Sequence, residues 1–373
     1  MNLKKCLKNM NYNNCEQGII TDSFEKWDKL FSFLPDNIKS PFFSSKYYQA
    51  YSNVENEKIE CFCCYKDDNN FLFYPYIRKE INALGYKLPD KYFDISGAYG
   101  YNGPIGKVSD PDFLQYFNNS LKEYLSKTNV VTEFVRYCPI IDNRKFHTYP
   151  NQIDVLDNIY IDLSKGIDEV WNNSFEKKVR SAIRKAESYQ LVTEFYKGQE
   201  VNKEQLSIFY DIYINTMQRN LAEQFYYFEK SFFESLLNHL GNELLLSITY
   251  LSNNPISTEL VLIGPKIAYG FLGGTLSEYY QYKANTFLMW KLFNNLITRG
   301  IEIYTMGGGA TRGDSIYKFK QSFSKHCNNP FFIGTYVHLP EIYNIIISQW
   351  VEQFPLAADK YSYQLQGYRH QFL

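Results

Sequence analysis

Three β-rich runs that follow one another closely constrain the fold of this 373-residue chain more than any other feature. The runs cover residues 243–251, 256–263 and 266–272. Their connections are short enough to force antiparallel neighbours. A helix is predicted next over 284–299, followed by a buried strand over 301–306. An antiparallel meander that leads into one helix and one further strand narrows the choice of fold.

The segment upstream of the meander adds helices to this unit. A helix is predicted over 175–189, with Val179 and Ile183 on its apolar side. A strand over 191–196 and helices over 203–219 and 230–240 follow. The unit therefore has a mixed α/β composition.

The chain is longer than one hydrophobic core usually requires, so we expect two domains. The first part contains a predicted hairpin, a helix and another strand, at 59–65 with 71–77, at 111–127 and at 130–137. Residues 142–158 are polar, contain Pro150 and lack periodicity, so we place the domain boundary in this segment. We therefore expect an N-terminal domain over 1–156, completed by 340–373, and a second domain over 157–339.

Composition limits the class of protein. The formal net charge is −1, which argues against an extended nucleic-acid footprint and against a DNA-binding protein, although a local basic patch remains compatible. No signal-peptide core precedes the first domain, and no apolar run reaches transmembrane length. We expect a soluble, cytoplasmic protein.

The cysteines and histidines do not predict a metal site. Seven cysteines are mostly scattered, which suits reduced thiols. Cys61 and Cys64 form a C-x-x-C pair without the second pair of ligands that zinc needs, so we interpret them as small apolar residues on a strand. The five histidines show no ligand-like spacing.

A glycine triplet follows the strand predicted at 301–306. Gly307, Gly308 and Gly309 would let a ligand approach the backbone closely, and a helix beginning near Asp314 would offer N–H groups to a phosphate or carboxylate. The alternative is a plain turn with Asp314 or Ser315 as the helix N-cap. Lys320 lies just beyond, where its ammonium could neutralise an oxyanion or simply face solvent.

Glu259 is a polar residue among apolar neighbours on the second strand of the meander. Alternation places it on one face with Val261 and Ile263, where burial would raise its pKa toward the working range of a general base. The alternative is a salt bridge to Arg180 or Arg184, which belong to a basic helix face. That face would bind phosphates or be merely solvated.

Several spaced blocks resemble FemAB-type proteins of the GNAT acyltransferase superfamily. The resemblance covers roughly residues 177–323 well and the first domain weakly. The blocks are KVRSAIRKAE at 178–187, TMQR at 216–219 followed by YF at 227–228, FLGGT at 271–275, YKANTFLMW at 282–290, MGGG at 306–309 and FKQSF at 319–323.

This resemblance implies two GNAT-like mixed-sheet domains packed around a central cleft. It also implies transfer of an acyl or aminoacyl group to an amine of a cell-envelope precursor, either a peptidoglycan peptide or a surface-polysaccharide amino sugar. Carried onto this chain, Lys320 acts at the donor carbonyl, and Tyr269 and Arg219 line the acceptor cleft. Tyr269 is also a catalytic candidate that could relay the proton in place of Glu259. Tyr101 lies in the block YGYNGP at 99–104, which resembles a Gly-Pro element of the family.

The resemblance leaves the donor open between an acyl-CoA and an aminoacyl-tRNA, and it implies no tightly bound cofactor. GNAT proteins usually hold the CoA pyrophosphate on a glycine-containing loop, yet no glycine lies between Gly274 and Leu288. No heptad segment suggests the long helical arm of tRNA-dependent members, and no acid follows Pro104 closely. A catalytically silent protein that binds a surface-glycan or peptide intermediate is the alternative function.

Overall fold

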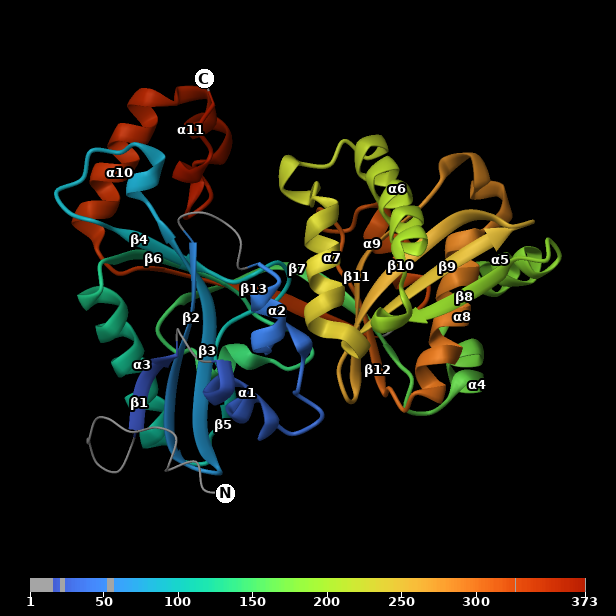
Figure 1. The fold of residues 1–373 in the computed structure, drawn as a ribbon, viewed down its shortest axis with the longest axis horizontal. Helices are drawn as coiled ribbons and strands as arrows, with labels where there is room; N and C mark the ends of the chain where they lie inside the picture. The colour runs from blue at the N-terminus through green and yellow to red at the C-terminus, as the bar shows by residue number, and fades with distance from the viewer. Residues whose placement is uncertain (1–15, 21–23, 52–56, 326, 373) are drawn as a thin grey trace. The chain divides into compact units, whose positions relative to one another are not determined.

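The computed structural model describes residues 16–20, 24–51, 57–325 and 327–372. The chain divides into two compact units (Figure 1). Unit 1 comprises residues 1–34, 42–155 and 331–373, and unit 2 comprises residues 35–41 and 156–330.

Unit 2 is built on a mixed sheet whose strands occur in the order β7-β12-β11-β10-β9-β8. All neighbours are antiparallel except β11 and β12, which are parallel. The predicted meander is therefore confirmed. The strands are β7 (Asn151–Asp162, of which 156–162 belong to this unit), β8 (Val192–Lys197), β9 (Leu244–Leu251), β10 (Asn254–Ile263), β11 (Ile267–Thr275) and β12 (Ile303–Gly307).

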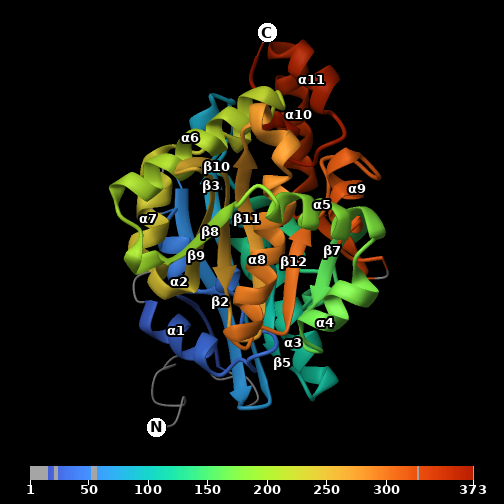
Figure 2. The same cartoon turned by 90° about the vertical axis from the view of Figure 1, so that its right-hand side faces the viewer.

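Helices cover both faces of this sheet. Helices α5 (Lys177–Glu187) and α8 (Ala284–Thr298) bury their apolar residues against one face (Figure 2). Helix α6 (Lys203–Arg219) packs on β10 and β11 from the other face, and α7 (Lys230–Leu240) packs on α6. A capping box at Asn202 starts α6 where the sequence predicts it. Two short helices complete the unit, α4 (Ile167–Glu169) and α9 (Ser315–Gln321).

In unit 1 the strands follow the order β1-β2-β3-β4-β6-β13, with β5 paired to β3. Only β4 and β6 run parallel. The predicted hairpin is the pair β2 and β3, joined at Asp68 and Asn69. The strands are β1 (Glu16–Ile20), β2 (Glu57–Asp67), β3 (Asn70–Glu80), β4 (Phe93–Ser96), β5 (Ile105–Lys107), β6 (Val130–Arg136) and β13 (Asn328–Val337, of which 331–337 belong to this unit).

Two apolar clusters hold helices to this sheet. Helix α3 (Pro111–Lys127) contributes Phe113, Phe117 and Leu121 to one cluster. Helices α10 (Pro340–Gln353) and α11 (Pro355–Tyr361) form the other with Val131 of β6, so the C-terminal segment packs on this unit. Helices α1 (Phe24–Ser32) and α2 (Ser45–Gln49) also belong here.

The mixed α/β fold class is confirmed. The segment 142–158, which lacks apolar periodicity and was expected to contain the domain boundary, includes the start of a strand, because β7 begins at Asn151 and continues to Asp162. Its pairing with β12 starts at Ile159. Backbone hydrogen bonds to a partner distant in sequence can stabilise a strand that has no apolar periodicity of its own.

The cysteine thiols of β2 are buried. Cys61, Cys63 and Cys64 form no disulfide. None of the described helices is long and apolar enough to span a bilayer. In the described ranges, no group of three or more His, Cys, Asp or Glu side chains is placed to hold a metal ion.

Candidate active site

Glu259 lies in the middle of β10, opposite Gly273 of β11 and Ser247 of β9. Its side chain is on the face covered by α5 and α8, where Val261 joins the apolar core. The hydroxyl of Tyr304 on β12 donates a hydrogen bond of 3.4 Å to Glu259 Oε1. The carboxylate is thus set into a largely apolar face.

The surroundings of Glu259 change its acidity. Burial raises the pKa of its carboxyl group to about 7, and this effect outweighs the opposing influence of Lys320 and of the Tyr304 hydrogen bond. A carboxylate of this kind can accept a proton near neutral pH, as a general base must.

Lys320 lies in the last turn of α9, and its ammonium donates a hydrogen bond of 2.7 Å to the carbonyl oxygen of Gly308. Burial lowers the pKa of Lys320 to about 8, although the negative charges of Glu259 and Asp314 act in the opposite direction. Glu259 and Lys320 therefore influence each other across the same site, and both titrate close to neutral pH.

The glycine triplet makes a tight turn between β12 and α9. Gly307 has a φ of +72°, which favours glycine, and a Cβ at this position would lie 3.6 Å from Lys320 Nζ. A Cβ at Gly308 would lie 2.8 Å from the carbonyl oxygen of Asp157, and one at Gly309 would lie 2.2 Å from Asp314 Oδ1. Glycine is required here because the turn passes close to other protein groups.

Asp314 is the N-cap of α9, which is the plainer of the two interpretations of this turn. Its carboxylate accepts hydrogen bonds from the backbone N–H groups of Ala310, Thr311 and Tyr317, at 2.7 to 2.9 Å. These groups are therefore used inside the protein, and the expectation that the start of α9 offers them to a phosphate is not supported by this geometry.

Tyr269 does not join Glu259 and Lys320. It pairs with Leu262 on β10, whereas Glu259 pairs with Gly273 across the irregularity in the β10 and β11 register. Paired residues of a sheet share a face and alternate along the strand, so Tyr269 and Glu259 are on opposite faces. Tyr269 is buried, with 1% of its surface exposed.

Arg219 ends α6 and binds the far end of β11. Its Nη1 donates a hydrogen bond of 2.8 Å to the carbonyl oxygen of Thr275, and its guanidinium lies 5.3 Å from the centre of the Tyr280 ring. Tyr280 is exposed, so this arginine and its aromatic partner are at the surface of unit 2.

The arginines of α5 do not pair with Glu259. Arg180 donates hydrogen bonds to the carbonyl oxygens of Trp171 and Phe175, at 3.1 and 2.7 Å. Arg184 lies over the Trp171 ring, 5.6 Å from its centre. Arg180 is thus occupied in holding the segment before α5, while Arg184 is on the exposed side of the helix.

Tyr101 belongs to unit 1. Its ring makes edge contacts with Phe42 and Phe331, with ring centres 5.2 and 5.9 Å apart. These contacts place it in an aromatic group of that unit.

Sequence reasoning missed Tyr304, Gly270 and Gly273 as parts of this site. Tyr304 reaches Glu259 because β12 pairs in parallel with β11, which sets Tyr304 opposite Ala268. Nothing local in the sequence reveals that pairing. The one available signal was Gly270 inside the strand predicted at 266–272, since such a glycine often marks a close approach; Gly273 directly follows that predicted strand.

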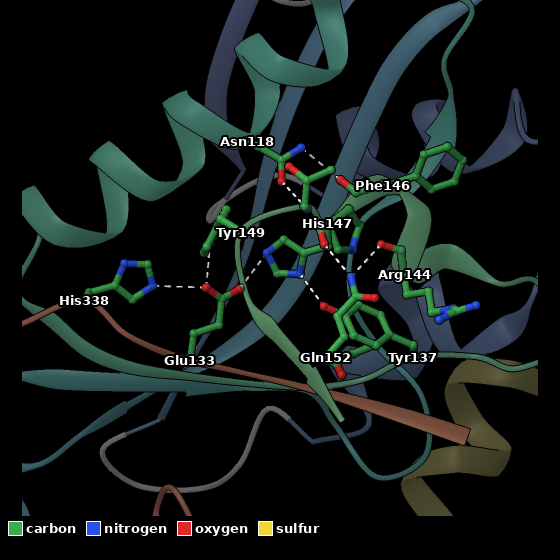
Figure 3. Close-up of polar contacts among 12 residues, drawn as sticks. Asn118, Glu133, Tyr137, Arg144, Phe146, His147, Tyr149, Gln152 and His338 are labelled. Atoms are coloured by element: carbon green, nitrogen blue, oxygen red, sulfur yellow. Dashed lines mark hydrogen bonds and ion pairs between the residues drawn. The ribbon is translucent and has the colours of Figure 1, made fainter. Parts of the chain in front are cut away.

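A second polar cluster in unit 1 was also missed (Figure 3). Glu133 of β6 lies 3.2 Å from His147 Nε2 and 3.0 Å from His338 Nε2, and Tyr149 donates a hydrogen bond of 2.6 Å to it. All three side chains of the Glu133, His147 and His338 group are fully buried. Burial alone would raise the pKa of Glu133, but His147 and His338 outweigh it and hold that pKa well below its usual range.

A family model matches most of the second unit. Residues 173–320 match the model of the acetyltransferase (GNAT) domain. Glu259 and Lys320 both lie within the matched range. No curated protein sequence matches the chain significantly.

Solved structures show the same fold over most of the chain. FemX is similar with a TM-score of 0.64 and 14% identity, covering 88% of this chain and 99% of FemX. A tandem GNAT protein from the clavulanic acid biosynthesis pathway has a TM-score of 0.51 and 8% identity, covering 87% and 99%. The C-terminal domain of a protein described as a lysylphosphatidylglycerol synthetase, from Agrobacterium fabrum, has a TM-score of 0.51 and 11% identity, covering 83% and 92%.

The predicted likeness to the FemAB-like branch of the GNAT superfamily is confirmed at the level of the fold by the similarity to FemX. Identities this low establish the architecture, and the chemistry must be argued from the site itself.

Proposed function

We propose that this protein transfers an acyl or aminoacyl group to an amine of a cell-envelope precursor. The observation that carries the proposal is that Glu259 and Lys320 lie close enough to influence each other's charge within the GNAT-like segment, with pKa values of about 7 and about 8. A carboxylate and an ammonium that both titrate near neutral pH suit proton transfer and oxyanion stabilisation at one centre.

In the proposed mechanism, Glu259 takes a proton from the acceptor ammonium. The free amine then attacks the carbonyl carbon of the donor, forming the new C–N bond and a tetrahedral oxyanion. Lys320 faces that oxyanion: one of its three N–H donors holds Gly308, and the others remain for substrate. When the intermediate collapses, the bond from the carbonyl carbon to the thiol sulfur or ribose oxygen breaks, and the leaving group takes the proton held by Glu259. The attacking nitrogen releases its second proton to solvent, which leaves a neutral amide.

We also propose roles for the remaining candidate residues. Arg219 is proposed to bind the acceptor, as the FemAB-like resemblance implies. Tyr101 of unit 1 is proposed separately as a substrate-binding residue. Gly307 has a φ of +72°, which favours glycine, so we assign the triplet to shaping the turn beside the donor. In this mechanism Tyr269 takes no part in proton transfer, because it lies on the other face of the sheet from Glu259.

The donor and the acceptor are proposed by class. The donor is an acyl-CoA or an aminoacyl-tRNA used as co-substrate, and the acceptor is a peptidoglycan peptide or an amino sugar of a surface polysaccharide. Support for a cell-envelope precursor as acceptor comes from the FemX-like fold and from the lysylphosphatidylglycerol synthetase domain of the same architecture. We propose that the reaction occurs in the cytoplasm.

The test is a direct comparison of donors. Purified protein is incubated with acyl-CoAs or aminoacyl-tRNAs and with muropeptide or amino-sugar acceptors, and the release of free CoA or deacylated tRNA is measured. Amine-dependent release that disappears in Lys320→Ala and persists in Lys318→Ala supports the proposal, since Lys318 is an exposed lysine of the same helix. Precursor binding without turnover of any donor contradicts it and favours a silent binding protein.

A further inference from the structure

Two glycines on β11 leave a slot beside the Glu259 carboxylate. A Cβ at Gly273 would lie 2.2 Å from Glu259 Oε2, and a Cβ at Gly270 would lie 3.0 Å from Oε1 and 2.6 Å from the Tyr304 hydroxyl. Any larger residue would displace the carboxylate or the hydroxyl. Glycine weakens a strand interior, so two of them three residues apart indicate that these side chains need the space.

Tyr304 enters the same slot from the neighbouring strand. Its ring is buried, with 1% of its surface exposed, and lies against Phe293 of α8 with ring centres 5.5 Å apart. Its backbone is fixed between Ala268 of β11 and Ile161 of β7. Packing on both sides leaves the ring little freedom, so the hydroxyl is held in a defined place.

We propose that Tyr304 is a positioning residue for Glu259: its hydroxyl fixes one carboxylate oxygen in the slot formed by Gly270 and Gly273. The inference rests on the proposed role of Glu259 as the base. Burial beside Glu259 raises the pKa of Tyr304 well above its usual value, so the hydroxyl stays protonated and acts as a donor. A fixed carboxylate needs less rearrangement to receive a proton from a bound amine.

The hydrogen bond also stabilises the ionised form of Glu259. The groups that act on this carboxylate are Tyr304 from β12 and Lys320 from α9, and both lower its pKa against the effect of burial. Removing the hydroxyl alone should therefore raise the pH at which Glu259 loses its proton, while Lys320 keeps its own influence.

Tyr304→Phe tests this because it keeps the ring packing and removes only the donor. In protein labelled with ¹³C at glutamate carboxyl carbons, Glu259 is assigned by the signal lost in Glu259→Gln and then titrated. We expect its midpoint to rise by about half a unit in Tyr304→Phe, which corresponds to one ordinary hydrogen bond. The acid limb of the kcat/KM profile should move by the same amount.

Tyr48→Phe is the matched control. Tyr48 is a fully buried tyrosine of unit 1 whose hydroxyl donates a hydrogen bond of 2.9 Å to the carbonyl oxygen of Pro75. Its loss should leave the Glu259 titration unchanged. An unchanged midpoint in Tyr304→Phe overturns the inference, and the titration requires no substrate. A shifted midpoint with an unshifted kcat/KM profile would instead reject Glu259 as the base.

Discussion

The ammonium of Lys320 donates a hydrogen bond of 2.7 Å to the carbonyl oxygen of Gly308, across the turn that joins β12 to α9. This bond ties the lysine to the glycine triplet, so its position is determined by the path of the backbone. Burial at this position also weakens its hold on the proton and leaves it half ionised close to neutral pH. The position of Lys320 is therefore coupled to that of the glycine triplet.

We predict a narrow bell-shaped pH dependence of kcat/KM. Glu259 must be ionised to accept a proton and Lys320 must be protonated to hold the oxyanion, and their pKa values are about 7 and about 8. Activity should therefore peak between these values and fall on both sides, with the two apparent pKa values belonging to the pair. A profile that stays flat from pH 6 to 9 contradicts the assignment of roles.

Replacement of Lys320 should remove catalysis without removing substrate binding. In Lys320→Ala we expect kcat to fall by about 10²- to 10³-fold, the usual loss when one oxyanion donor is deleted. The exposed Lys318 is the control, and Lys318→Ala should retain kcat within about twofold, because a surface change of this kind is nearly neutral. Steady-state kinetics of both variants decide the point, and equal losses would refute the role of Lys320.

Glu259→Gln should make the protein more heat-resistant in mildly alkaline solution. Burial raises the pKa of Glu259 in the folded state above its value in the unfolded chain. Between these two pKa values the native protein binds more protons than the unfolded chain. The free energy of unfolding therefore falls as pH rises through this window. Glutamine removes that loss. We expect its thermal midpoint to exceed that of the parent by a few degrees at pH 8, with little difference at pH 4. Calorimetry of the parent and of Glu259→Gln at pH 4 and pH 8 is the measurement. A thermal midpoint of the variant below that of the parent at pH 8 would contradict the prediction.

Glu133 should stabilise unit 1 except in strong acid. Its folded-state pKa is lowered, so its contribution is present above the usual pKa of a glutamate and is lost as pH falls through the folded value. Glu133→Gln leaves two buried imidazoles without their carboxylate and should cost roughly 3 to 5 kcal/mol at pH 7. The difference from the parent should shrink in strong acid.

The control for this change is Glu123→Gln on α3. Glu123 pairs with Lys127 at 2.5 Å, but both side chains are exposed, so its loss should change stability by less than about 1 kcal/mol. Denaturation curves of both variants across pH give the comparison. Similar effects of the two substitutions would show that the buried histidine cluster adds no stability.

The sequence by itself determined the elements whose signals are local. Helices α6 and α7 occupy 203–219 and 230–240 as predicted, because apolar residues repeat at helical spacing between clear start and stop signals. The meander was predictable because its turns are short. Glu259 could also be singled out, since alternation along one strand is a local property.

Only the tertiary structure decided which groups meet. Tyr304 reaches Glu259 through the parallel pairing of β12 with β11, and His338 reaches Glu133 across 205 residues of chain. Residues 151–158, in the segment expected to contain the domain boundary, belong to β7, and the register of β10 with β11 puts Tyr269 on the face away from Glu259. Strand pairing joins distant segments through backbone hydrogen bonds that leave no local pattern in side chains, and burial, which sets the pKa values of Glu259 and Lys320, depends on that packing.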